Sequence, residues 1–164
     1  MKSLALCFIY VALSLSALSC APQRASVAPV APYMRKADVS RLVPADLSFA
    51  KDFVQTLSDA GWEIREVSNS KFNGFFPDTE KSAYIETDKG VIEAIFFQSK
   101  ADVEQIQVSE VKDKSSGYHG YTVRKPPATN QRIEGGDCYF KKYQNVFVIT
   151  SDREANDALN QLLV

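Results

Sequence analysis

The chain of 164 residues is 45% apolar and 24% charged, which is typical of one globular domain with an additional N-terminal segment. Its 19 lysines and arginines are balanced by 20 aspartates and glutamates, so there is no excess of positive charge that would attract nucleic acid. We therefore expect no nucleic-acid partner.

Residues 1–19 have the pattern of an export signal peptide. Lys2 supplies a positive charge, and an uncharged apolar run of fifteen residues follows, Leu4–Leu18. This run is shorter than the roughly 20 residues that a helix needs to span a bilayer. We therefore expect the segment to direct export.

The end of this run, Ser16–Cys20, reads SALSC and resembles the lipobox of bacterial lipoproteins, with Ala17 where that family most often has leucine. The resemblance implies cleavage before Cys20, a diacylglycerol on its sulfur and an acyl chain on its new amino group. Two or three acyl chains anchor a protein stably, whereas one chain binds only marginally. The alternatives are ordinary cleavage at the A-x-A-like pair Ala17 and Ser19, with a soluble product, and an uncleaved anchor.

The lipoprotein resemblance implies a location in the bacterial cell envelope. Ala21 follows the cysteine, whereas aspartate at this place would favour retention at an inner membrane. We expect the outer membrane if the cell has two membranes, and otherwise the outer face of the plasma membrane. The membrane is thus one expected partner, through the lipid anchor, and another envelope protein is the second.

Residues 20–44 form the next segment. After the cysteine it reads APQRASVAPVAPYMRKADVSRLVP, in which four prolines interrupt any continuous helix. We expect a flexible, lipid-anchored tether. Packing of part of it against the domain as an edge strand is the alternative.

Residues 45–164 are expected to form the globular domain, which begins with an amphipathic helix. Asp46 or Ser48 is placed to cap it, and Gly61 to end it. Its apolar side chains recur every four positions, at Phe49, Phe53 and Leu57. Strands are expected at 62–67, 82–87 and 91–98, the last two joined by a turn at 88–90.

The second half of the domain predicts the same kinds of element. A helix that starts at Ser99 would carry Val103, Ile106 and Val111, and a loop would span 112–120. Further strands are expected at 121–125, 137–142 and 146–150, and a final helix opens at Ser151. The expected fold class is α+β, with two layers: a largely antiparallel single sheet of five or six strands, and helices on one face. The aromatic residues expected in the core are Phe53, Trp62, Phe96, Phe140 and Phe147.

Three stretches of the domain, LSDAGW, NGFFPDTEKSAYIETDKGVIEAIFF and CYFKKYQNVFVITSDREANDALNQLL, resemble a group of small bacterial secreted proteins and lipoproteins. The resemblance implies the fold and the envelope location. It implies no activity and no site residue.

The sequence offers no metal or cofactor motif and no catalytic site. One histidine and one remaining free cysteine do not fill a zinc shell, and the phosphate-binding and serine-hydrolase motifs are absent. Cys138 and His119 would form a nucleophile–base pair if they touched, but a lone cysteine in an apolar strand is more often inert packing. We therefore expect no enzyme and no cofactor.

Five aromatic residues in loop-like, glycine-containing stretches form the candidate binding surface. An exposed cluster of them would mark a partner or ligand site, although packing in the core is the favoured alternative. The predicted function is a non-enzymatic interaction module, and the alternative is a protein that binds a small molecule or lipid in a pocket. The five residues are Phe72, Phe75, Phe76, Tyr118 and Tyr121.

Overall fold

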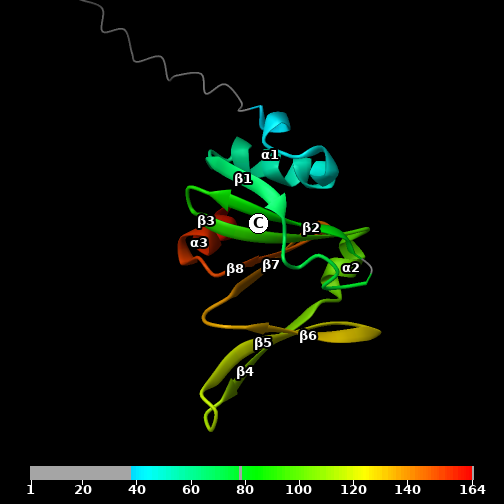
Figure 1. Ribbon diagram of the computed structural model, residues 1–164, viewed down its shortest axis with the longest axis vertical. Coiled ribbons are helices and arrows are strands. Elements are labelled where there is room, and N and C mark those ends of the chain that lie inside the picture. Colours follow the sequence, from blue (N-terminus) through cyan, green and yellow to red (C-terminus); the bar gives the residue numbers. More distant parts are fainter. Residues whose placement is uncertain (1–37, 78, 164) are drawn as a thin grey trace, which may run out of the picture. The chain divides into compact units, whose positions relative to one another are not determined.

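The computed structural model describes residues 38–77 and 79–163, so the expected signal peptide, Cys20 and most of the expected tether lie outside the described residues. The described residues form an α+β fold of three α-helices, two short 3-10 helices and eight strands in two antiparallel sheets (Figure 1). This confirms the predicted class. The prediction of one sheet was wrong, because the strands divide into a sheet of five and a sheet of three.

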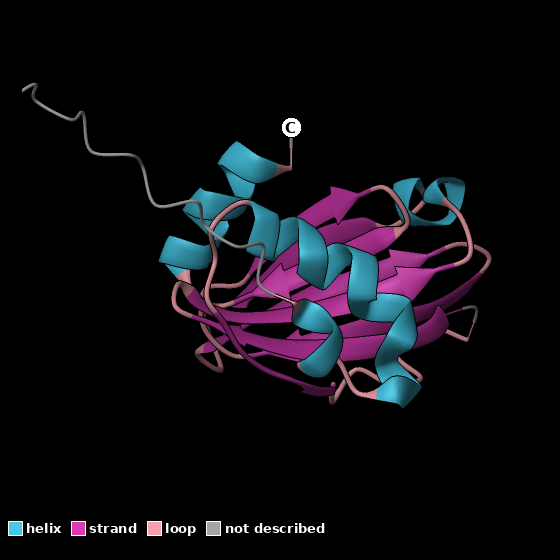
Figure 2. Ribbon diagram, turned by 90° about the horizontal axis from the view of Figure 1, so that it is seen from above, coloured by secondary structure: helices cyan, strands magenta, loops and turns pink. Residues whose placement is uncertain are grey.

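Helices cover one face of the five-stranded sheet (Figure 2). The 3-10 helix η2 (Ala45–Ala50) leads directly into α1 (Lys51–Asp59), so neither Asp46 nor Ser48 caps α1. The last helix, α3 (Arg153–Leu162), has Asp152 at its N-cap instead of Ser151. Phe53 of α1 and Leu159 of α3 lie in one core with the sheet, as their spacing predicts.

The folded unit begins before residue 45. A short 3-10 helix, η1 (Val39–Arg41), precedes η2, and both Val39 and Val43 are buried in the same core as α1. Burying these two side chains removes apolar surface from water, which stabilises the packed arrangement. Residues 38–44 therefore belong to the folded domain, although the sequence assigned them to the tether.

The five-stranded sheet has the order β1-β2-β3-β8-β7. Alternate residues of a strand point to opposite faces. On β3, Ala94 and Phe96 face the helices, whereas Ile95 and Phe97 face the other side. The strands are β1 (Ile64–Asn69), β2 (Thr79–Thr87), β3 (Gly90–Phe97), β7 (Tyr139–Tyr143) and β8 (Val146–Thr150).

The second helix is shorter than predicted. Ser99 caps α2 (Lys100–Glu104) as expected, accepting a hydrogen bond from the backbone N–H of Asp102. Val111, however, belongs to a strand, because residues 107–113 pair along their whole length with 118–124. The three-stranded sheet that results has the order β4-β5-β6, with β4 (Gln107–Asp113), β5 (Tyr118–Lys125) and β6 (Ala128–Glu134).

A second core lies on the face of the five-stranded sheet opposite α1. It joins Ile95 and Phe147 of that sheet to Val123 and Ile133 of the three-stranded sheet. Val103 of α2 also belongs to this core, so α2 does not share the face that α1 and α3 cover. Of the aromatic residues expected inside, Phe140 is partly buried, and the others are buried: Phe53, Trp62, Phe96 and Phe147.

Candidate ligand-binding site

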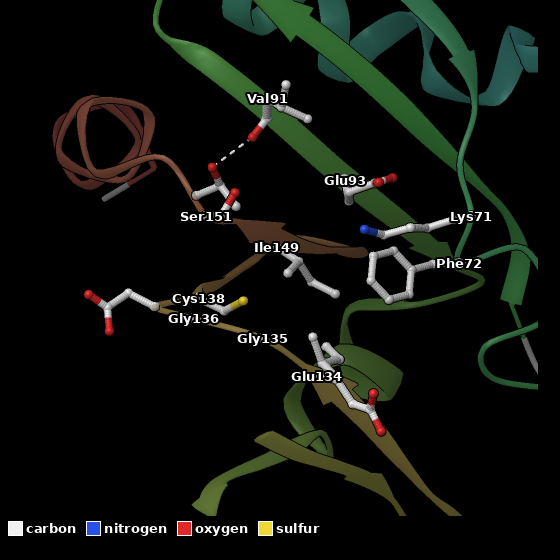
Figure 3. A pocket seen from close by; sticks show the side chains of 13 residues that line it. Lys71, Phe72, Val91, Glu93, Glu134, Gly135, Gly136, Cys138, Ile149 and Ser151 are labelled. Atoms are coloured by element: carbon white, nitrogen blue, oxygen red, sulfur yellow. Dashed lines mark hydrogen bonds between the residues drawn. The ribbon is translucent and has the colours of Figure 1, made fainter. Parts of the chain in front are cut away.

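A pocket of about 470 Å³ opens beside the second core, where β3 and β8 meet the segment between β6 and β7 (Figure 3). Its volume lies within the roughly 300–1,000 Å³ typical of sites for small molecules. Apolar side chains form much of its wall, including Phe72, Ile133 and Ile149. Charged side chains also line it, one lysine and three acidic residues, and the most buried carboxyl group among them is that of Glu93.

Glu93 reaches the pocket because of its position in β3. The strand is central, hydrogen-bonded to β2 and β8, and its sequence VIEAIFF is otherwise apolar. The alternation of the strand places Glu93 on the same face as Ile95 and Phe97, away from the helices. Its side chain therefore stays inside the fold, and the residue is only 8% exposed.

The carboxyl group of Glu93 is only partly satisfied. Its Oε2 atom is buried and has no hydrogen-bond partner among the described residues. Burial raises the pKa of Glu93 above its usual value, although a hydrogen bond with Ser70 and the charge of Lys71 lower that pKa in part. Leaving a buried polar group without a hydrogen-bond partner costs about 1–3 kcal/mol of stability. A ligand that donates a hydrogen bond to Oε2 would remove this cost.

Lys71 supplies the positive charge of the pocket. It follows the end of β1, and Figure 3 shows its side chain reaching into the pocket beside Phe72 and Glu93. Its Nζ atom lies 5.3 Å from the centre of the Phe72 ring, a cation–π distance. The pocket thus contains an ammonium group and a buried carboxyl group next to an aromatic ring.

The segment after β6 forms the wall of the pocket opposite β3. Gly135 has a φ of 108°, which side chains of L-amino acids rarely adopt, so the turn depends on glycine there. The chain then continues to Cys138, whose sulfur points into the pocket (Figure 3). The backbone N–H of Cys138 donates a hydrogen bond to the hydroxyl of Tyr121 at 3.3 Å, which connects this wall to β5.

Cys138 and His119 both lie beside Tyr121, but no hydrogen bond joins the two among the described residues. The ring of His119 is hydrogen-bonded to Glu110 at 2.8 Å and lies 5.6 Å from the ring of Tyr121. Burial raises the pKa of the Cys138 thiol, which is the opposite of what an activated nucleophile needs. The geometry therefore gives no support to a nucleophile–base pair.

The five aromatic residues of the expected binding surface do not form one exposed patch. Phe76 is fully buried and Phe72 is 9% exposed, because the turn after β1 directs their rings into the second core. Phe75 is partly buried between them, with ring centres 5.0 Å from Phe72 and 4.9 Å from Phe76. Tyr118 and Tyr121 lie on β5 and are partly exposed. Core packing thus explains Phe72 and Phe76.

The sequence analysis did not predict that Glu93 and Lys71 belong to a binding site. Glu93 had a usable signal, since it is the one charged residue in the apolar run Val91–Phe97 and burying a charge is costly. Lys71 had none, because only the folded turn after β1 brings it to the pocket.

Within 38–77 and 79–163, no three histidine, cysteine or acidic side chains gather in a way that would hold a metal ion. None of the helices there has the length and hydrophobicity that crossing a bilayer requires.

Comparison of the chain with models of protein families, with curated proteins and with solved structures gives no match.

Proposed function

We propose that this protein is a non-enzymatic, lipid-anchored protein of the bacterial cell envelope that binds a small molecule in the pocket beside the second core. The observation that carries the proposal is the Oε2 atom of Glu93, a buried acceptor without a partner in the wall of a cavity of about 470 Å³. Ligand sites typically combine apolar walls with polar groups that orient the ligand, and this pocket has both kinds of side chain in its lining.

The pocket is a better candidate than an aromatic partner surface. A partner surface needs exposed rings, and two of the five candidate rings, Phe72 and Phe76, are instead buried. The small-molecule alternative from the sequence therefore becomes the leading proposal, and the interaction module becomes the second.

The proposed location rests on the sequence alone. A leader ending at Cys20 supports acylation, and the fatty chains would hold the folded domain at a bilayer surface. The absence of enzymatic activity is proposed because burial raises the pKa of the Cys138 thiol, which disfavours the reactive thiolate, and because the ring of His119 is hydrogen-bonded to Glu110.

Protection of Cys138 from alkylation tests the proposal. The full-length protein in detergent is treated with iodoacetamide in the presence of each member of a library of small metabolites, and modification of Cys138 is quantified by peptide mass spectrometry. We expect one or more compounds to slow the modification saturably and to raise the melting temperature, since a ligand at 100 times its Kd adds about 2.7 kcal/mol of stability.

A second thiol serves as the internal control. Ser109 is exposed on β4 and does not line the pocket, so a Ser109→Cys variant reports on compounds that merely react with iodoacetamide. A true ligand slows modification of Cys138 and leaves that of residue 109 unchanged. If no compound protects Cys138 selectively, the proposed function is contradicted.

A further inference from the structure

The carboxyl group of Glu93 calls for a ligand group that donates hydrogen bonds. Its Oε2 atom is buried without a donor, and the other interactions of the group come from Ser70 and from the charge of Lys71. Hydrogen bonds between charged partners are worth about 1.5–3 kcal/mol, more than bonds between neutral groups. A protonated amino group is therefore the best match to this atom.

The ammonium group of Lys71 would bind a negatively charged group of the ligand. It influences Glu93 through coulombic attraction, whereas the hydrogen bond to that carboxyl group involves Ser70, so the ammonium group of Lys71 keeps its donors for a ligand. A carboxylate is a natural partner for these donors. Phe72 lies under the Lys71 ammonium group at 5.3 Å and offers a flat apolar surface to the rest of the ligand.

A ligand with a single charge fits the pocket less well. A simple amine would leave the ammonium group of Lys71 without an anionic partner, and a simple acid would be repelled by Glu93 and by the further acidic residues of the lining, Glu134 and Asp137. A molecule with both charges meets an opposite charge at each end. Its uncharged part then lies against Ile149 and Ile133 on the apolar wall.

We infer that the ligand is a small zwitterion, an α-amino acid with an apolar side chain, whose amino group binds Glu93 and whose carboxylate binds Lys71. This inference deepens the proposed function and rests on it. It names a class of ligand that has both charges within one short molecule.

Isothermal titration calorimetry with matched probes tests the inference on the full-length protein. L-Phenylalanine is compared with phenethylamine, which lacks the carboxylate, and with 3-phenylpropionate, which lacks the amino group. L-Leucine, 3-methylbutylamine and 4-methylpentanoate form a second set with an aliphatic side chain. We expect the amino acid of at least one set to bind about tenfold or more tightly than both of its analogues, a difference of about 1.4 kcal/mol.

Two variants test which residue binds the amino group of the ligand and which binds its carboxylate. Glu93→Gln should weaken the amino acid and the amine about tenfold while leaving the acid unchanged or tighter. Lys71→Gln should weaken the amino acid and the acid, and leave the amine unchanged or tighter. Because Lys71 is exposed, its replacement tests the inference even if Glu93→Gln disturbs folding. Glu66→Gln, at an exposed glutamate on β1, is the matched control and should change none of the affinities.

The outcomes separate this inference from the proposed function. If library compounds protect Cys138 but neither amino acid binds more tightly than its amine and acid analogues, the zwitterion inference is overturned and the proposed function stands. Equal affinity of wild type and both variants for the bound amino acid also overturns the inference. If no compound protects Cys138, both fail.

Discussion

Glu93 on β3 and Ile149 on β8 are register partners in the antiparallel ladder, and both line the same pocket. A carboxyl group therefore stands opposite an aliphatic side chain in the middle of an otherwise apolar sheet. An apolar residue would pack there without the cost of desolvating a carboxylate. The most economical explanation is that Glu93 serves a bound molecule and that the unliganded fold is less stable because of it.

Replacing Glu93 with glutamine should change how the stability of the protein depends on pH. Burial raises the pKa of Glu93 above the ordinary 4.5, so the folded state holds this proton more tightly than the unfolded state does. The stability of the wild type should therefore fall as pH rises through and above 4.5, until the folded carboxyl group is itself ionised. Glu93→Gln removes this loss, so its stability relative to wild type should increase with pH.

Urea unfolding of wild type and Glu93→Gln between about pH 4 and pH 8 measures this difference. Glu66→Gln removes one carboxylate from an exposed position and should show no such trend. A difference between wild type and Glu93→Gln that stays constant over the whole range would contradict the role of burial.

Phe76 should be essential for stability. It is fully buried in the second core, with its ring 5.6 Å from that of Phe97, so Phe76→Ala leaves a cavity and should cost about 3–5 kcal/mol of unfolding free energy. Leu42 is 39% exposed, and Leu42→Ala should change stability by no more than about 0.5 kcal/mol. Chemical denaturation compares the two, and equal losses would argue against the buried position of Phe76.

The elements with strong periodicity could be predicted from the sequence. Phe53 and Leu57 recur at helical spacing, and the strands on either side of the Asp88–Gly90 turn alternate or run apolar, so α1, β2 and β3 were found. The prediction of a helix through Ile106 and Val111 was wrong, because the few apolar residues of this stretch also fit a helical stripe. Only pairing with β5 across the 114–117 turn decides for a strand, and the apolar pattern of the segment alone does not reveal that pairing.

The candidate site was less accessible to sequence reasoning than the fold. Phe72 and Phe76 lie in a glycine-containing stretch that suggests a surface loop, yet the turn after β1 directs both rings inward. The segment 135–138 meets Glu93 only because two sheets pack together, and no local pattern encodes that approach. Glu93, the charged residue within the apolar run VIEAIFF, was the one feature of the sequence that indicated the pocket.

Gly90 should tolerate no side chain. Its φ is 127°, and a Cβ atom there would lie 2.5 Å from the Cβ of Asp152, whose carboxylate accepts a hydrogen bond from the backbone N–H of Val91 at 2.7 Å. Gly90→Ala should therefore destabilise the protein by about 1–3 kcal/mol or more. Gly136→Ala is the control, since a Cβ there meets nothing within 4 Å, and thermal unfolding should leave it close to wild type. Equal stability of the two variants would argue against this packing.

Cys20 should carry the lipid anchor. Mass spectrometry of the intact protein from the membrane fraction should show a chain that begins at Cys20 with the added mass of a diacylglycerol and an acyl group. Cys20→Ala should lose this mass and leave the membrane fraction. A wild-type chain that is recovered in soluble form with an unmodified thiol would contradict the proposed location.

The position of the bound ligand tests the central claim most directly. Backbone NMR spectra of the protein are recorded while the compound that best protects Cys138 is titrated in. A ligand in the pocket predicts that the largest shift changes fall on the amides of 91–93, 133–138 and 149–151, with little change at Val111 and Tyr118. Shift changes concentrated at Val111 and Tyr118, with none around Glu93, would contradict the assignment of the pocket as the ligand site.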